Sequence, residues 1–281
     1  MDWLLAPLDY EFLQRALAEA VLMGAACGLL GVLVVLRGLS YAGESLSHAL
    51  LPGAAIAVAV GAPAVGGAVL AAVAAAILVA VLLRRPDIGQ DVSIGIVLPA
   101  AFAVGVIVLS QWGTPRDLDS LLFGSILAAG PADVQLGAAA LLLALAIIVV
   151  AGRRMVLASF DRSFARVLGA RPGLLDAVLL AGLALALAVA LRGVGTLLVL
   201  ALLLAPPATA RLLVPRVATM LWLSPLLGVT SGIAGLYLSY YADLAASPSI
   251  ALVAIGLFVL ALGVAPARRL VARPQARPRA V

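Results

Sequence analysis

Long apolar stretches, separated by short polar or Gly/Pro breaks, dominate this chain. The breaks include Gly61-Ala62-Pro63 and Arg84-Arg85-Pro86-Asp87. An apolar run of roughly 20 residues is what an α-helix needs to cross the hydrocarbon core of a bilayer. The pattern therefore predicts an all-α, polytopic membrane protein. Its helices are expected, to within a few residues, at 16–36, 40–60, 64–83, 93–110, 133–151, 174–191, 195–213, 219–240 and 248–265.

The expected number of spans is about eight or nine. The segment 117–130 is too short to span, and we interpret it as a helical piece that lies at one face or re-enters the membrane. If the first apolar stretch does not fully cross, eight spans remain. Composition agrees with a membrane protein, since 65% of the 281 residues are hydrophobic and 11% are charged. Soluble domains are about half apolar and about a quarter charged.

Arginine placement indicates which side of the layout faces the cytoplasm. The chain contains no lysine, and 15 of its 18 basic residues fall on one side of the nine-segment layout. Basic residues collect on the cytoplasmic side of bacterial membrane proteins. We therefore expect a cytoplasmic C-terminus and an external N-terminus. The arginines expected outside are Arg15, Arg116 and Arg192.

Charge and cysteine content exclude several classes of protein. The net charge of +5 does not indicate a nucleic-acid partner, because the arginines follow membrane sidedness. A P-loop needs a lysine, so an ATPase that drives transport must be a separate chain. A single cysteine, Cys27, excludes an intrachain disulfide. We expect one membrane domain over residues 1–267, a Pro/Arg-rich cytoplasmic tail over 268–281, no enzymatic activity and no permanently bound cofactor.

The single histidine of the chain, His48, follows Glu44 by four residues within an apolar segment. Residues i and i+4 share a helix face, so both side chains would point the same way at membrane depth. Ionisable groups there are costly and by default mark an ion, proton or substrate pathway. An imidazole beside a carboxylate suits a first-row divalent metal, which Ser40, Ser47, water or another helix would further ligate. The alternative is a satisfied interhelical pair with a structural role.

Prolines predict two discontinuous helices. Pro52 lies four residues after His48 and removes the backbone hydrogen bond to the His48 carbonyl. Pro206 and Pro207 remove two consecutive bonds in the same way. We expect a helix break at Pro52 and a kinked or split helix at the proline pair, which is how some transporters line an ion site. The alternative at the pair is an ordinary kink satisfied by Thr209 or water.

The longest expected cytoplasmic loop, residues 152–173, contains a predicted amphipathic helix. Ser159 or Asp161 can cap its start, and Gly169 can end it. Arg162 and Arg166 line one side of this helix. The other side carries an apolar stripe at helical spacing, which consists of Phe160, Phe164, Val167 and Leu168. Such a helix suits docking into a groove on a partner, and the alternative is a helix that lies on lipid.

Four stretches in chain order carry a resemblance over nearly the whole chain. They are Leu30–Arg37 running into Gly43–Gly53, then Leu121–Leu127, then Ser159–Gly169, and then Val194–Leu198 continuing through Pro206 to Arg211. Together they resemble the permease subunits of the bacterial zinc/manganese/iron ABC importers. The element Ser47-His48-Ala49-x-x-Pro52-Gly53 is specific, and the combined order is more specific than any one piece.

The resemblance implies an ABC importer permease of the metal/chelate type in the bacterial cytoplasmic membrane. It implies Glu44 and His48 as the metal-site pair, although the family commonly has Asp at position 44 and a small residue at Pro207. It also implies an ATP-binding ABC subunit, an extracytoplasmic metal-binding protein and a second permease copy as partners. The positions implied to engage the ATPase are Ser159, Phe160, Asp161, Phe164, Ala165, Arg166 and Gly169.

We therefore predict the permease subunit of an ATP-driven importer of zinc, manganese or iron, with zinc or manganese favoured. The first rival is a proton- or ion-coupled secondary carrier in which Glu44 and His48 act as a relay. The second rival is a non-transporting membrane scaffold in which both residues only hold helices together. The metal stays open, because imidazole and carboxylate suit all three ions.

Overall fold

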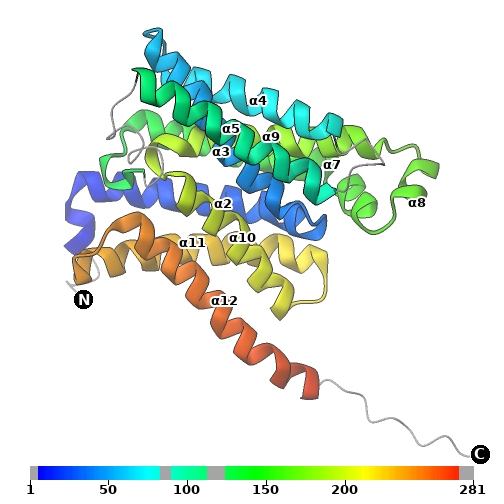
Figure 1. Cartoon of the computed structure of the whole chain (residues 1–281). Coiled ribbons are helices and arrows are strands. Elements are labelled where there is room, and N and C mark those ends of the chain that lie inside the picture. The colour runs from blue at the N-terminus through cyan, green and yellow to red at the C-terminus, as the bar shows by residue number, and fades with distance from the viewer. Residues whose placement is uncertain (1–5, 83–89, 113–123, 272–281) are drawn as a thin grey trace, which may run out of the picture.

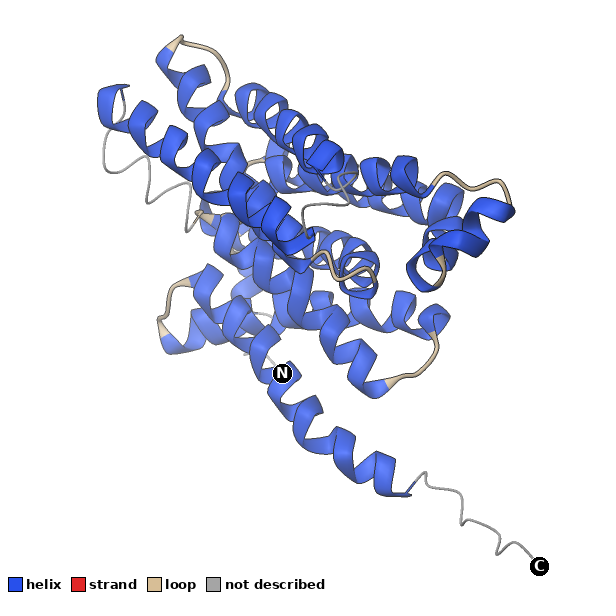
Figure 2. Ribbon diagram, turned by 45° about the vertical axis from the view of Figure 1, so that its right-hand side comes forward, coloured by secondary structure: helices blue, strands red, loops and turns tan. Residues whose placement is uncertain are grey.

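The computed structural model describes residues 6–82, 90–112 and 124–271, which form helices joined by short connections (Figure 1). No strand occurs within these residues (Figure 2). Three short helices are described, namely η1 (Ala6–Asp9), η2 (Ile126–Ala128) and α8 (Arg162–Val167). The long helices in these ranges are α2 (Glu11–Leu36), α3 (Ser40–Ala59), α4 (Ala64–Leu82), α5 (Gln90–Trp112), α7 (Pro131–Phe160), α9 (Pro172–Gly193), α10 (Thr196–Leu213), α11 (Val217–Ala242) and α12 (Ala246–Val271).

The long helices of the described ranges follow the nine apolar segments in order, which confirms the all-α prediction. Six of them, α2, α7, α9, α10, α11 and α12, are long and apolar enough to cross a membrane by length and composition. Shorter apolar stretches lie in α4 and α5. The first half of α3 carries Glu44, His48 and three serines, and this polar content lowers its mean hydropathy. The estimate of eight or nine spans is therefore approximate.

Helix α2 runs through the centre of the bundle and packs against α7, α10 and α11 (Figure 1). Glycines allow its backbone to touch its neighbours. A Cβ atom on Gly24 would stand 2.6 Å from the carbonyl oxygen of Gly228, and one on Gly28 would stand 2.7 Å from the Cα of Pro225. Close backbone contact at small residues is the usual way in which membrane helices pack. Helices α3, α4, α5 and α9 form a second group beside this centre.

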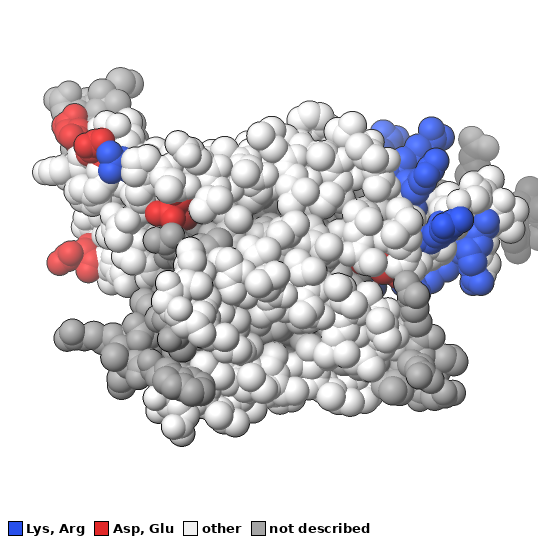
Figure 3. Space-filling model, turned by 90° about the horizontal axis from the view of Figure 1, so that it is seen from above, with Lys and Arg blue, Asp and Glu red and all other residues white. Residues whose placement is uncertain are grey.

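Charged side chains gather at two ends of the bundle, with a largely uncharged band between them (Figure 3). The end that carries α8, called the α8 end below, holds the exposed residues Arg153, Arg154, Arg162, Arg166 and Arg171. The opposite end holds the acidic residues Asp9, Glu11 and Asp243. Because basic residues mark the inner side of a membrane protein, the α8 end is the one we expect to face the cytoplasm.

Two boundaries differ from the sequence-based expectation. Helix α7 continues to Phe160 rather than ending near 151, so most of the expected loop 152–173 is helical. It continues because Met155 and Ala158 are buried in the bundle although they lie beyond the apolar stretch. In the segment 117–130, residues 117–123 lie outside the described ranges, and the remainder contains the single turn η2.

Both helices that were expected to break at prolines are continuous. Helix α3 runs through Pro52, and α10 runs through Pro206 and Pro207. Neither helix is split at its prolines, and the kink that was the other expectation at the proline pair stays a prediction. The Leu203 carbonyl, which Pro207 leaves without its helical donor, lies against Gly31 of α2, where a Cβ would clash with it. The proline pair thus lies in a close contact between α2 and α10.

Candidate functional site

The acidic and imidazole side chains predicted as a metal site lie one turn apart on α3. Glu44 and His48 are both half-buried. Between them, Ser45 and Ser47 are fully buried, and the Ser47 hydroxyl donates a hydrogen bond of 2.9 Å to the Gly43 carbonyl. The serines therefore face the bundle interior, whereas Glu44 and His48 lie nearer its margin. The Ser47 hydroxyl, which was one candidate ligand, is engaged with its own helix.

The rotation of α3 is set by contacts further along the helix. Ala55 follows Glu44 by eleven residues and His48 by seven, so the three share one helix face. Ala55 is buried against Val108 of α5. On another face, Gly53 meets Gly67 of α4 so closely that neither could carry a Cβ without displacing the other backbone. Packing against α4 and α5 therefore holds the Glu44/His48 face in one direction.

Within the described residues, His, Cys, Asp and Glu side chains do not make up a complete metal site at this pair. Among the described residues, no group of three or more His, Cys, Asp or Glu side chains could hold a metal ion. Glu44 and His48 supply one carboxylate and one imidazole, which suit Mn²⁺, Fe²⁺ or Zn²⁺. The remaining ligands would be water, hydroxyls, backbone carbonyls or groups of another chain. The metal role of the two residues stays a prediction.

Helix α8 has the cap and the stop that its sequence predicts. The Asp161 carboxylate accepts hydrogen bonds of 2.8 Å from the backbone N–H groups of Ser163 and Phe164, which satisfies two free donors at the helix start. Asp161, rather than Ser159, is thus the cap. Gly169 follows the helix with a positive φ of 78°, a conformation that favours glycine.

Helix α8 buries one small residue and exposes its apolar stripe. Ala165 is fully buried against the bundle. Phe160 and Val167 are 71% and 82% exposed, and Phe164 and Leu168 are also exposed. These four side chains, which run from the last residue of α7 to the residue after α8, form what we call the α8 surface, which lies at the basic end of the molecule. Large apolar side chains grouped on a helix that protrudes beyond the bundle are typical of a docking surface.

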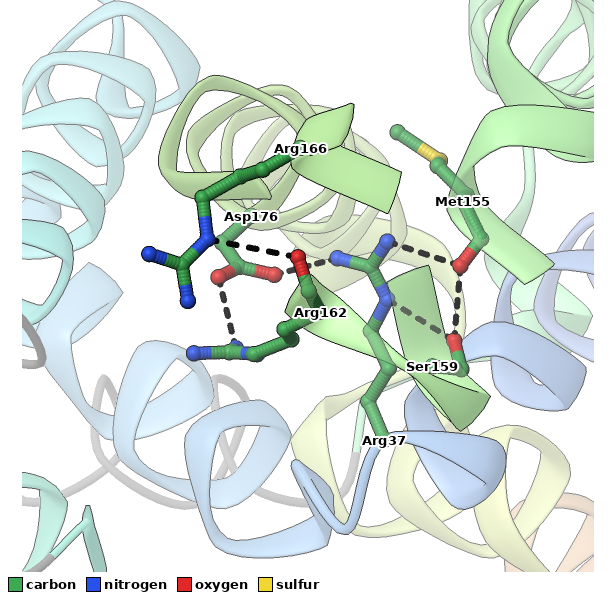
Figure 4. Close-up of polar contacts among 6 residues, drawn as sticks. All are labelled: Arg37, Met155, Ser159, Arg162, Arg166 and Asp176. Carbon is green, nitrogen blue, oxygen red and sulfur yellow. Dashed lines mark hydrogen bonds and ion pairs between the residues drawn. The ribbon is translucent and has the colours of Figure 1, made fainter. Parts of the chain in front are cut away.

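An ion-pair network joins α8 to three long helices (Figure 4). Arg37, which caps the end of α2, pairs with Asp176 of α9. Asp176 also pairs with Arg162 of α8 at 2.8 Å. The Arg37 guanidinium further donates to the Ser159 hydroxyl at 3.2 Å and to the Met155 carbonyl at 3.1 Å, both on α7. The network therefore ties the ends of α2, α7 and α9 to α8.

Burial sets the electrostatics of this network. The side chains of Arg37 and Asp176 are 5% and 9% exposed, whereas that of Arg162 is 54% exposed. Burial lowers the pKa of Arg37 below its usual value, while the Asp176 carboxylate raises it and Arg162 lowers it further. Asp176 thus compensates part of the cost of burying the guanidinium.

Sequence reasoning missed two buried carboxylates. Asp176 is a lone acid at the start of the expected segment 174–191, and Glu19 is a lone acid within 16–36. Glu19 is 2% exposed and lies against Gly193, which has no room for a Cβ beside that carboxylate. An isolated acid in an apolar segment is the signal that could have identified both, because such groups are rarely buried without a role.

Several known proteins are similar to this chain. The manganese transport system membrane protein MntC of Halalkalibacterium halodurans is 38% identical over 267 residues, which cover 95% of this chain and 91% of that protein. The chelated iron transport system membrane protein YfeD of Yersinia pestis is 32% identical over 256 residues, covering 91% of this chain and 86% of that protein. The solved structure titled PsaBC from Streptococcus pneumoniae in complex with Fab has a TM-score of 0.84 at 31% identity, covering 96% of this chain and 98% of that one.

A family model identifies the chain as a whole. The model described as the ABC 3 transport family matches residues 9–265. The match includes α3 with Glu44 and His48, the α8 surface, and the network of Arg37 and Asp176. Because the match covers most of the chain, it leads to one conclusion: this chain belongs to the ABC 3 transport family.

Proposed function

We propose that this chain is the permease subunit of an ATP-driven importer that moves a divalent transition metal across the cytoplasmic membrane. The observation that carries the proposal is the half-buried Glu44/His48 pair on α3, in a bundle of apolar helices. A carboxylate and an imidazole at membrane depth are the ligands such an ion would need. The names of the relatives support manganese or iron as the cargo, and zinc is compatible with the same donors.

We propose three partners for the permease. An ATP-binding subunit would cover the α8 surface, because a groove on a partner can bury its four exposed apolar side chains. A second permease copy would complete the pathway, which would supply ligands that one copy lacks among its described residues. An extracytoplasmic metal-binding protein would deliver the ion to the acidic end opposite α8. In this assembly, ATP binding and hydrolysis would shift the bundle between states that open to opposite sides.

Reconstitution in liposomes tests the proposal. The chain, its ATPase and its metal-binding protein would be assembled together, and uptake of Mn²⁺, Fe²⁺ and Zn²⁺ would be measured with ATP or with a non-hydrolysable analogue. We expect uptake of at least one of these ions with ATP only. A secondary carrier would instead take up the ion in response to a proton gradient without nucleotide, and that outcome would contradict the proposal. Absence of uptake of all three ions by an assembled complex would also contradict it.

A further inference from the structure

We propose that Arg37 and Asp176 form a positioning pair that transmits the movement of α8 to α3, the helix that carries Glu44 and His48. The inference rests on the proposed function, in which α8 docks the ATPase. It assigns to these two residues a role in coupling ATP hydrolysis to metal movement, without contact to either the nucleotide or the metal.

One end of the connection is the turn between α2 and α3. Arg37 is the last residue before this turn, and α3 begins three residues later at Ser40. The turn is tight, because the Leu39 N–H donates to the Val34 carbonyl at 2.9 Å and Gly38 has a φ of 67°. With so few residues between them, a displacement of the Arg37 backbone is passed directly to the first turn of α3. Glu44 lies on the next turn of that helix.

The other end of the connection is α8. Arg162, the first residue of α8, reaches Asp176 at 2.8 Å. Asp176 uses its other carboxylate oxygen for Arg37. One carboxylate therefore bridges the docking helix and the α2–α3 turn, as Figure 4 shows. A movement of α8 that pulls Arg162 must either carry Arg37 along or break the bridge.

Burial distinguishes this bridge from a surface ion pair. Arg37 and Asp176 are almost enclosed, so water cannot replace either partner cheaply when the other moves. A well-packed apolar pair of similar size would fill this space at no desolvation cost. An ion pair has defined partners and a defined direction, so it can hold two helices in one relative position. Apolar side chains would fix that position less specifically. Arg162 is the exposed residue of the network, so a docked partner can displace it.

Two variants separate coupling from simple stability. Asp176→Asn breaks both ion pairs, whereas Arg162→Gln removes only the ion pair between α8 and Asp176 and leaves Arg37 and Asp176 paired. Arg154→Gln is the matched control, because Arg154 is an exposed arginine at the same end of α7 and lies outside the network. In proteoliposomes that contain the full complex, Mn²⁺ uptake and ATP hydrolysis are measured on the same vesicles, and binding of the ATPase is measured separately.

We expect both variants to bind the ATPase and to hydrolyse ATP, but to import less Mn²⁺ per ATP. The ratio should fall at least about fivefold in Asp176→Asn, which is the lower end of typical coupling effects. It should fall less in Arg162→Gln and should not change in Arg154→Gln. The exchange Arg37→Asp with Asp176→Arg should recover part of the ratio.

Two results would overturn the inference. One is a wild-type ratio in both variants, and the other is a fall of uptake and hydrolysis in equal proportion, which indicates a structural role only. If Asp176→Asn does not fold, Arg162→Gln decides by itself, since it leaves no buried charge unpaired. Failure of the proposed function has a different signature, because the wild-type complex would then show no ATP-dependent uptake of Mn²⁺, Fe²⁺ or Zn²⁺.

Discussion

Two polar clusters of the bundle differ in how deeply they are buried. We call Arg37 with Asp176 the closed cluster, and Glu44 with His48 the open cluster. Glu44 and His48 lie half-buried near the margin of the bundle. Arg37 and Asp176 are almost fully buried, and each makes at least two hydrogen bonds or ion pairs. A site that takes up and releases an ion must leave ligand positions open, whereas a group that transmits force must have its partners fixed. Arg37 and Glu44, one residue of each cluster, lie seven positions apart in the chain, on either side of the α2–α3 turn.

The largest stability effect is expected at the closed cluster. Asp176→Ala should lower the free energy of unfolding by about 3–5 kcal/mol, because it leaves the Arg37 guanidinium buried without its counter-charge. Combining Arg37→Met with Asp176→Leu should recover most of this loss, because an apolar pair of similar volume buries no charge and therefore needs no counter-charge. Unfolding can be followed through Cys27, the single cysteine of the chain, which is buried and becomes reactive to a fluorogenic maleimide when the bundle opens. If Asp176→Ala and wild type had the same free energy of unfolding, the Arg37 guanidinium would not depend on Asp176 for its counter-charge.

A smaller effect is expected where α3 is held against α4. Gly53→Ala should destabilise the bundle by about 1–3 kcal/mol, because its Cβ would overlap the Gly67 carbonyl and the two helices would have to separate. The matched control is Gly66→Ala, where nothing lies within 4 Å of the added Cβ. Maleimide labelling of Cys27 on heating measures both variants. The same unfolding midpoint in Gly53→Ala and Gly66→Ala would mean that this contact does not hold the rotation of α3.

The smallest effect is expected at the start of α8. Asp161→Ala removes an N-cap and should cost about 1 kcal/mol of local helix stability. Because this loss is confined to a surface helix, we expect weaker binding of the ATPase with little change in the unfolding of the bundle. Binding of detergent-solubilised permease to the immobilised ATPase measures it. Asp161→Asn, which can still cap, is the control and should bind nearly as well as wild type. Equal binding by Asp161→Ala would place the docking surface elsewhere.

Local patterns predicted much of this arrangement. The order of the long helices, the exposed stripe of α8 and the cap at Asp161 all follow from periodicity and residue type within about one turn. The end of α7 could not be predicted in this way, because hydropathy marks where the apolar stretch ends and not where the helix ends. The sequence predicted a break at Pro52 and left a kink or a split open at Pro206 and Pro207, because a proline rule considers one helix only and not the helices packed against it.

The closed cluster could not be derived from sequence patterns. Arg37 and Asp176 are 139 residues apart in the chain, and no local spacing relates them. Arg37 was noted only as a basic-side arginine and as the end of the resemblance stretch Leu30–Arg37, and Asp176 was not singled out. The pairing depends on how α2, α7, α8 and α9 converge at one end of the bundle. By contrast, Glu44 and His48 could be proposed from the sequence because both lie on the same helix at i and i+4, and their metal role stays a prediction.

The most direct test of the account is ATP-dependent Mn²⁺ uptake by the reconstituted complex with Glu44→Gln or His48→Ala beside wild type. Loss of a ligand should reduce uptake by more than about 100-fold, beyond the range found for groups that only support a ligand. Both variants should unfold at the same temperature as wild type by Cys27 labelling, because the open cluster makes little contribution to stability. Wild-type uptake by the two folded variants would contradict the assignment of the pathway to α3.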